Sequence, residues 1–266
     1  MAKQSQETEG FAYMPDHQSE FVPVQKWVRV FLGGWVIADS KRPLLLRQAR
    51  GTPVYYFPQE DVRMEALAPS EHRTLSDTFG KAFYWNVQAG GKVAENAAWQ
   101  YVDLPQEASS LKVRIAFEWN KMDAWFEEDE QVYAHPHDPF HRIDIRHSSR
   151  HVKVVIAGET VAETHHPTLL FETGLPVRYY IPRLDVRQDL IIPSEKVTWC
   201  AYKWRASHYS IQVGDQLVKD IAWSYPFPNP ELAKIQNLFC FYNERLDDFY
   251  VDGELVPKPK TPWSEA

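Results

Sequence analysis

The sequence predicts a mainly β protein of two tandem antiparallel β-modules, each with one short helix, arranged as a pseudo-symmetric pair. Three observations predict this class: an internal repeat, apolar residues that alternate with the period of a half-buried strand, and glycine-containing turns between the alternating runs. The chain has 266 residues, of which 44% are hydrophobic and 14% aromatic. A chain of this length and composition can bury a substantial core.

The repeat relates positions that lie 124 residues apart. YYFPQEDVR begins at Tyr55 and YYIPRLDVR begins at Tyr179, and the Ala-Trp-x-Tyr sequence at 98–101 recurs at 222–225. A constant spacing over most of the chain indicates two copies of one module. We place the boundaries as follows: a mobile N-terminal arm at 1–24, modules at 25–132 and 149–256, a proline- and histidine-rich linker at 133–148 and a C-terminal tail at 257–266.

Each module begins with a predicted hairpin of two short strands. WVRVF from Trp27 and HVKVVIA from His151 alternate apolar and polar residues, as a strand with one buried face does. Gly33-Gly34 and Gly158 follow these runs and favour tight turns with positive φ. The sequence therefore predicts the same first hairpin in both modules.

A second hairpin and one helix follow in each copy. Gly90-Gly91 and Gly214-Asp215 separate alternating runs, and Asp252-Gly253 does so near the end of the second copy. The helix follows Pro105 in the first copy and Pro228 in the second, and is about two turns long in each.

Composition excludes several classes of protein. The formal net charge of −7 argues against nucleic-acid binding and against binding to an anionic membrane, because both need a basic face. No apolar run approaches the roughly 20 residues of a membrane span, and the first residues lack the apolar core of a signal peptide, so we expect a cytoplasmic protein. Cys200, Cys240 and the histidines of 135–151 match no zinc-ligand spacing. We predict no metal and no cofactor, and interpret the histidine stretch as a solvated connector.

The repeated YY-Φ-P-x-x-DVR sequence supplies the first candidate site. On an extended segment Asp61 and Arg63 share one face, as do Asp185 and Arg187. A carboxylate and a guanidinium so placed could bind a polar ligand together; alternatively, they tie a loop to its neighbours. In each tyrosine pair we expect one residue in the core and one that could line a cleft. These tyrosines are Tyr55, Tyr56, Tyr179 and Tyr180.

Aromatic residues supply the second candidate site. Trp99 and Tyr101 lie two residues apart, as do Trp223 and Tyr225, so each pair shares a face of an extended strand. Such residues either wall a pocket for a small ligand or pack in the core.

The third candidate site lies in the second copy only. Cys200, Tyr202 and Lys203 stand where the first copy has Ser76, Thr78 and Phe79. A lysine close to a cysteine lowers the pKa of the thiol, and a nearby histidine is a candidate base. The candidates for acid-base or nucleophilic chemistry are Lys203, Tyr202, Cys200 and His208. The alternative is that the cysteine is a small buried hydrophobic residue.

Read together, the motifs of the second copy resemble the DUF427 family, a domain of unknown function. They are YY-Φ-P-x-x-DVR, PS-x-x-T-x-C-x-Y-K, AW-x-Y and VDGE, and the resemblance covers nearly all of 25–256. It implies a compact β fold of the β-tent kind. Relatives with that fold usually hold zinc through two Cys-x-x-Cys pairs, which this sequence lacks, so no metal is carried over.

Three functions stay open at this point. The first is binding of a small polar or aromatic metabolite in an aromatic-walled pocket, preferably in the second copy because Lys203 and Tyr202 add polar groups. The second is an enzyme acting on a small polar metabolite. The third is a scaffold that binds protein. The sequence determines neither the ligand nor the oligomeric state.

Overall fold

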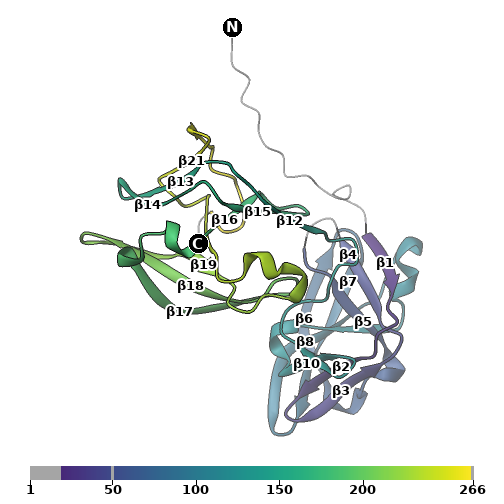
Figure 1. The fold of residues 1–266 in the computed structure, drawn as a ribbon. Helices are drawn as coiled ribbons and strands as arrows, with labels where there is room; N and C mark the ends of the chain where they lie inside the picture. The colour runs from purple at the N-terminus through teal and green to yellow at the C-terminus, as the bar shows by residue number, and fades with distance from the viewer. Residues whose placement is uncertain (1–18, 49–50, 265–266) are drawn as a thin grey trace. The chain divides into compact units, whose positions relative to one another are not determined.

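The computed structural model describes residues 19–48 and 51–264, and the chain divides into two compact modules, with the division between Asp138 and Pro139. Each module contains a seven-stranded and a four-stranded antiparallel sheet, so the predicted class of two similar β-modules is confirmed. In Figure 1, β13, β14 and β21 form one layer of the second module, and β17, β18 and β19 form the other.

Among its described residues the first module has eleven strands. The seven-stranded sheet has the order β1-β4-β5-β9-β8-β7-β6, and the four-stranded sheet has the order β11-β10-β2-β3. The strands are β1 (Ser19–Pro23), β2 (Val28–Leu32), β3 (Trp35–Ser40), β4 (Leu44–Gln48), β5 (Val54–Pro58), β6 (Leu67–Ser76), β7 (Gly80–Ala89), β8 (Lys92–Tyr101), β9 (Arg114–Phe117), β10 (Ala124–Glu127) and β11 (Glu130–Val132).

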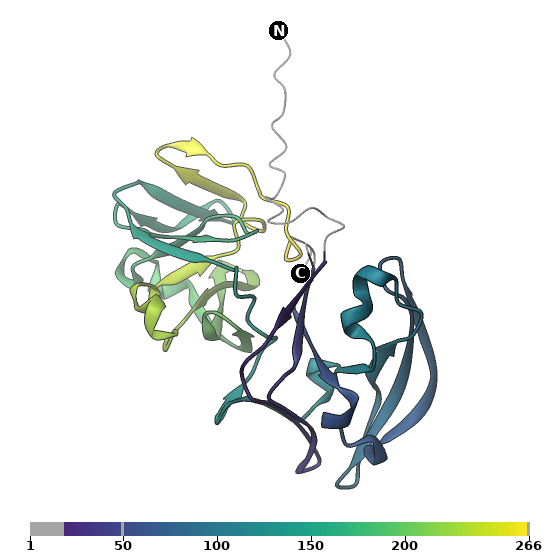
Figure 2. The same cartoon turned by 90° about the vertical axis from the view of Figure 1, so that its right-hand side faces the viewer.

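The second module repeats this topology, with the sheet orders β12-β15-β16-β20-β19-β18-β17 and β14-β13-β21-β22. Its strands are β12 (Ile143–His147), β13 (Val152–Ile156), β14 (Glu159–Thr164), β15 (Thr168–Glu172), β16 (Arg178–Ile181), β17 (Ile191–Cys200), β18 (Trp204–Val213), β19 (Gln216–Ser224), β20 (Phe239–Phe241), β21 (Asp248–Val251) and β22 (Glu254–Leu255). In Figure 2, turned by 90°, the yellow C-terminal strands lie beside the teal strands of the same layer.

Two strands lie outside the predicted module bounds. β1 falls in the predicted N-terminal arm and pairs with β4, and β12 falls in the predicted linker and pairs with β15. These short segments carry a weak strand signal of their own, and it is pairing with a neighbouring strand that orders them. The rest of the predicted arm, residues 1–18, lies outside the described residues.

The predicted helices after Pro105 and Pro228 are present as 3-10 helices, η3 (Gln106–Leu111) and η7 (Pro230–Ile235). Segments of six residues are too short to stabilise an α-helix, because helix nucleation is costly. Five further 3-10 turns are η1 (Gln59–Asp61), η2 (Met64–Ala66), η4 (Trp119–Lys121), η5 (Arg183–Asp185) and η6 (Gln188–Leu190).

Each large sheet is covered on both faces. One face packs on the small sheet through residues such as Val28 and Val30 in the first module and Val152 and Val154 in the second, which alternate with half-buried residues as predicted. The other face, which we call the helix-side face, is covered by η3 or η7. The Trp-x-Tyr residues of the second candidate site lie on this helix-side face.

Register shifts at matched positions bend the long hairpins. β7 and β8 shift between Trp85 and Val87, and β18 and β19 shift between Tyr209 and Ile211. Between the flanking pairs β8 and β19 each carry two more residues than the strand they pair with, and such a bulge sharpens the twist and bends the sheet. The seven-stranded sheet therefore curls around the core on its helix-side face.

The two modules differ in how closely the glycine turns within one module approach each other. A Cβ atom built on Gly90 would lie 1.9 Å from the carbonyl oxygen of Gly33, so the two turns of the first module meet backbone to backbone. The matched Gly214 has nothing within 4 Å of such an atom, although its φ of +52° is close to the +56° of Gly90.

We therefore expect Gly90→Ala to destabilise the protein more than Gly214→Ala does. Both variants carry the cost of about 1–2 kcal/mol for a left-handed alanine, and only Gly90→Ala adds a clash, worth about 1–3 kcal/mol more. Urea denaturation of both variants measures the free energy of unfolding. Equal losses would mean that the two turns of the first module do not touch.

Candidate functional site

Four side chains meet on the helix-side face of the second module, and we call them the turn cluster: His141, Glu172, Tyr202 and Lys203. Lys203, in the turn between β17 and β18, donates from Nζ to both carboxylate oxygens of Glu172, at 2.5 Å from Oε2. His141 Nε2 lies 3.0 Å from Glu172 Oε1. The His141 ring stacks on the Tyr202 ring, with centroids 4.0 Å apart and planes 17° apart.

The turn cluster closes the curled sheet on itself. Strands β16, β20 and β19 separate β15 from β18 in the sheet, yet Lys203 before β18 reaches Glu172 at the end of β15. This contact is made over the buried core that contains Tyr180, Trp223 and Tyr225. Closure of the sheet therefore depends on the turn that carries Lys203.

The charges of the turn cluster are largely withdrawn from solvent. The side chains of Glu172, Lys203 and His141 are 4%, 10% and 16% exposed. Burial alone would raise the pKa of the Glu172 carboxyl, but the hydrogen bond with His141 and the charge of Lys203 hold that pKa below its ordinary value. Glu172 is thus an ionised acceptor between two donors.

A strained residue follows the cluster. Trp204 has a φ of +79°, and the matched residue in the first module is Gly80, with a φ of +75°. This left-handed conformation costs a tryptophan free energy that a glycine does not lose. The turn is also anchored by Asn229 before η7, whose side-chain nitrogen donates to the carbonyl of Tyr202 at 2.6 Å. The backbone is thus strained at the residue that directly follows Tyr202 and Lys203.

In the first module the described residues at the same place are uncharged. Phe79, which matches Lys203, is buried and packs against Phe21 and Tyr101, with ring centroids at 6.2 and 5.2 Å. Gln48, which matches Glu172, is exposed. The residue that matches His141 is His17, which lies outside the described residues.

The aromatic residues of the second candidate site have matching surroundings in both modules. Trp99 Nε1 donates to the Tyr56 hydroxyl at 3.1 Å, and Trp223 Nε1 to the Tyr180 hydroxyl at 3.4 Å. The two ring pairs are perpendicular, at 84° and 89°. Tyr101 and Tyr225 share the faces of Trp99 and Trp223, as the spacing predicted.

These aromatic residues pack on one another. Tyr56, Tyr180, Trp223 and Tyr225 are all buried, and burial raises the pKa of Tyr180 and Tyr225 well above the ordinary value. The first tyrosine of each pair faces the other side of the sheet: Tyr55 donates to Glu127 Oε1 at 2.7 Å, and Tyr179 packs on Phe249. That these residues bind a ligand stays a prediction.

The Asp-Val-Arg segments are not extended as predicted. Asp61 and Asp185 end the 3-10 turns η1 and η5, because the preceding prolines start a turn that leaves only Val62 and Val186 in bridges to the neighbouring strand. The carboxylate and the guanidinium of each segment consequently bind different partners.

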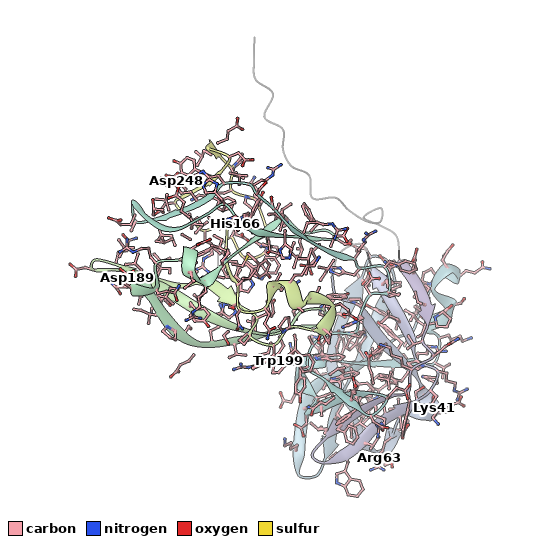
Figure 3. All side chains as sticks on the ribbon, viewed as in Figure 1. Lys41, Arg63, His166, Asp189, Trp199 and Asp248 are labelled. Carbon is pink, nitrogen blue, oxygen red and sulfur yellow. The ribbon has the colours of Figure 1, made fainter. Side chains whose placement is uncertain are left out.

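Each aspartate ties its turn to a hydroxyl group. Ser40 donates to Asp61 at 2.7 Å, and Thr164 donates to Asp185 at 2.5 Å. Arg187 forms an exposed ion pair with Asp189 at 2.6 Å. Arg63 lies near Glu65 and Trp35. Arg63 and Asp189 lie on the outside of their modules (Figure 3).

His208 is buried away from Cys200. Cys200 pairs with Trp204, and His208 lies four residues further along β18, about 13 Å away at the rise of a strand. His208 Nε2 lies 2.9 Å from Thr198 Oγ1, whereas Nδ1 is buried and has no hydrogen-bond partner among the described residues. Burial lowers the pKa of His208 to about 4. His208 and Cys200 are thus not neighbours in the sheet, and a role of His208 as a base stays a prediction.

A second buried ion pair lies on the same face, and neither of its residues is among the predicted site residues. Arg178 donates to both oxygens of Glu244, at 2.6 and 2.8 Å, and both side chains are buried. The guanidinium carbon lies 5.5 Å from the Trp223 ring and 5.9 Å from the Tyr242 ring. Two carboxylates and one histidine that matter here, Glu172, Glu244 and His141, were thus missed.

A comparison of the two copies could have found Glu172 and Glu244, which match Gln48 and Asn120, but not His141, which matches His17. At matched positions the first copy has Val54, Asn120 and Phe79 where the second has Arg178, Glu244 and Lys203. A charged residue in one copy that replaces an apolar or neutral residue in the other signals a difference in function, because the shared fold needs neither.

Residues 20–128 and 144–252 each match the family model described as a domain of unknown function, DUF427. The chain belongs to the DUF427 family. The matched segments begin at β1 and β12, which makes these two strands part of the DUF427 domains. Among curated proteins none matches the chain.

Two further properties bear on the site. Within residues 19–48 and 51–264 no group of three or more histidine, cysteine, aspartate or glutamate side chains is placed to hold a metal ion. In the same part of the chain no helix combines the length and the apolar character that crossing a membrane requires.

His208 should make stability depend on pH. Its folded pKa of about 4 lies below the ordinary 6.5, so the neutral form stabilises the fold fully above pH 6.5 and this contribution is lost as the pH falls towards 4. Between pH 6.5 and pH 4 we expect the free energy of unfolding of His208→Gln to fall by up to about 3 kcal/mol less than that of the wild type. The measurement is the free energy of unfolding at several pH values, with the exposed His166→Gln as control. An unchanged slope in His208→Gln would contradict the burial of the imidazole.

The Arg178–Glu244 pair gives a second test. Arg178→Met leaves a buried carboxylate without its cation and should cost about 3–5 kcal/mol in the free energy of unfolding. Arg178→Met with Glu244→Gln removes both charges and should recover most of that loss, which urea denaturation measures. A double variant no more stable than the single one would show that the loss is one of packing and not of charge.

Proposed function

We propose that the second DUF427 domain binds a small polar metabolite at the turn cluster, and that the first domain has lost, or never had, this site. The observation that carries the proposal is the replacement of the buried Phe79 by Lys203 in an otherwise matched fold. The duplicate thereby supplies a control within one chain.

The argument rests on the cost of burying charge. Two charges removed from water lose solvation free energy that their attraction only partly returns, and apolar replacements of buried ion pairs are often neutral or stabilising. In the first module the described residue at this position, Phe79, packs against the aromatic rings of Phe21 and Tyr101. Closure therefore does not require Lys203 and Glu172, and we attribute their presence to recognition.

The side chains indicate the chemistry of the ligand. Lys203 offers a cationic donor and His141 an imidazole, and both keep a small exposed fraction. Tyr202 and His141 add stacked flat rings. A small molecule with an anionic or carbonyl acceptor beside a flat group matches this set.

An enzymatic reaction at the same site is the second candidate. It is favoured by the His141–Glu172 hydrogen bond, because a carboxylate that orients an imidazole is a common arrangement of a general base. In this case the bound metabolite would be converted as well as held.

The test is a thermal-shift screen of a metabolite library against the whole chain. A ligand that binds only the folded state raises the melting temperature by mass action. We expect hits to be lost in Lys203→Phe with Glu172→Gln, which gives the second module the residues of the first, while the melting temperature without ligand stays the same or rises.

The matched control is Phe79→Leu in the first module, which should keep every hit. Hits that persist in the Lys203→Phe, Glu172→Gln variant would place binding elsewhere and overturn the proposal. Mass spectrometry of each hit after incubation with the protein separates the candidates: an unchanged hit indicates binding, and a converted one indicates an enzyme.

A further inference from the structure

The C-terminal segment, residues 257–264, lies over the Arg178–Glu244 pair of the second module. Thr261 donates from Oγ1 to Glu244 Oε1 at 2.6 Å, and the Trp263 ring lies 5.7 Å from the guanidinium carbon of Arg178. The backbone of Trp263 donates to Thr261 Oγ1 at 3.1 Å, and Thr261 donates from its backbone to Ser264 Oγ at 3.0 Å. The segment thus presents a hydroxyl and an indole together.

The surface below is formed by the molecule's own strands. Arg178 lies on β16, Trp223 on β19, and Tyr242 and Glu244 follow β20. With two aromatic rings already beside its guanidinium, Arg178 offers a third side for a flat group, and Glu244 offers an acceptor. Thr261 donates to the Glu244 acceptor, and the Trp263 ring lies beside the Arg178 guanidinium.

The segment is a cover and not part of the core. Trp263 remains 36% exposed, whereas Arg178 and Glu244 beneath it have side-chain exposures of 5% and 0%. Lys258 and Lys260, on the same segment, are exposed. The first module has Val54 and Asn120 in place of Arg178 and Glu244, so this surface belongs to the second module alone.

We propose that this surface is a peptide-binding site for segments that carry a hydroxyl residue two positions before a tryptophan, and that the chain's own tail fills it until such a segment of a partner protein displaces it. The recognition is chemical: Glu244 accepts from the hydroxyl, and Arg178 stacks on the indole. The proposal does not depend on the ligand of the turn cluster.

The experiment uses the full chain and a synthetic peptide of residues 257–266, PKPKTPWSEA. In the wild-type chain the attached tail competes at a high effective concentration. We expect the variant Thr261→Val with Trp263→Ala, whose tail is detached, to bind the peptide at least tenfold more tightly than the wild type does. Fluorescence anisotropy of the labelled peptide measures both affinities, and PKPKAPASEA is the control peptide.

Circular dichroism first establishes that the variant is folded. A folded variant that binds neither peptide, binds both equally, or binds no more tightly than the wild type would overturn the proposal. If the double variant unfolds, Trp263→Ala alone is titrated in the same way. If that variant unfolds as well, the tail is part of the core and the proposal fails.

Discussion

Closure of a curled sheet is the constraint on which both modules depend. Each seven-stranded sheet bends at matched bulges until the turn after β6 or β17 reaches the strands at the opposite side of the helix-side core. In the first module the contact is apolar, between Phe79 and Phe21, and in the second it is ionic, between Lys203 and Glu172. The contact encloses the helix-side cores that contain Tyr56 and Leu111 in the first module and Tyr180 and Ile235 in the second.

The closing contact can be apolar or ionic, so the residues that it covers can differ between the two copies. The second module gathers two buried ion pairs and a neutral buried histidine on one face, where the first has mainly apolar and aromatic side chains. Burying these groups opposes folding unless each is paired. The hydrogen bonds within each ion pair explain how the second module keeps the same topology. Under the proposed function, this face is the one that binds the ligand.

The aspartates of the repeated Asp-Val-Arg motif illustrate the opposite case. Both copies retain them, and both use them to bind a hydroxyl group on the neighbouring strand, Ser40 in one and Thr164 in the other. A feature that two copies share at this level of detail serves the fold. A feature that only one copy has, such as Arg178, points to a role that the fold does not require.

The sequence alone determined the duplication, the β class, the glycine turns and the shared faces of Trp99 with Tyr101 and Trp223 with Tyr225, because these follow from local periodicity and from a constant spacing. It also singled out Lys203 and Tyr202 by their difference from the first copy. Tertiary structure decided the rest: that β1 and β12 join the sheets, that His141 and Glu172 meet Lys203, and that His208 lies far from Cys200 along its strand. Those outcomes depend on how far a sheet curls and which distant strands it brings together, and no local pattern encodes that curvature.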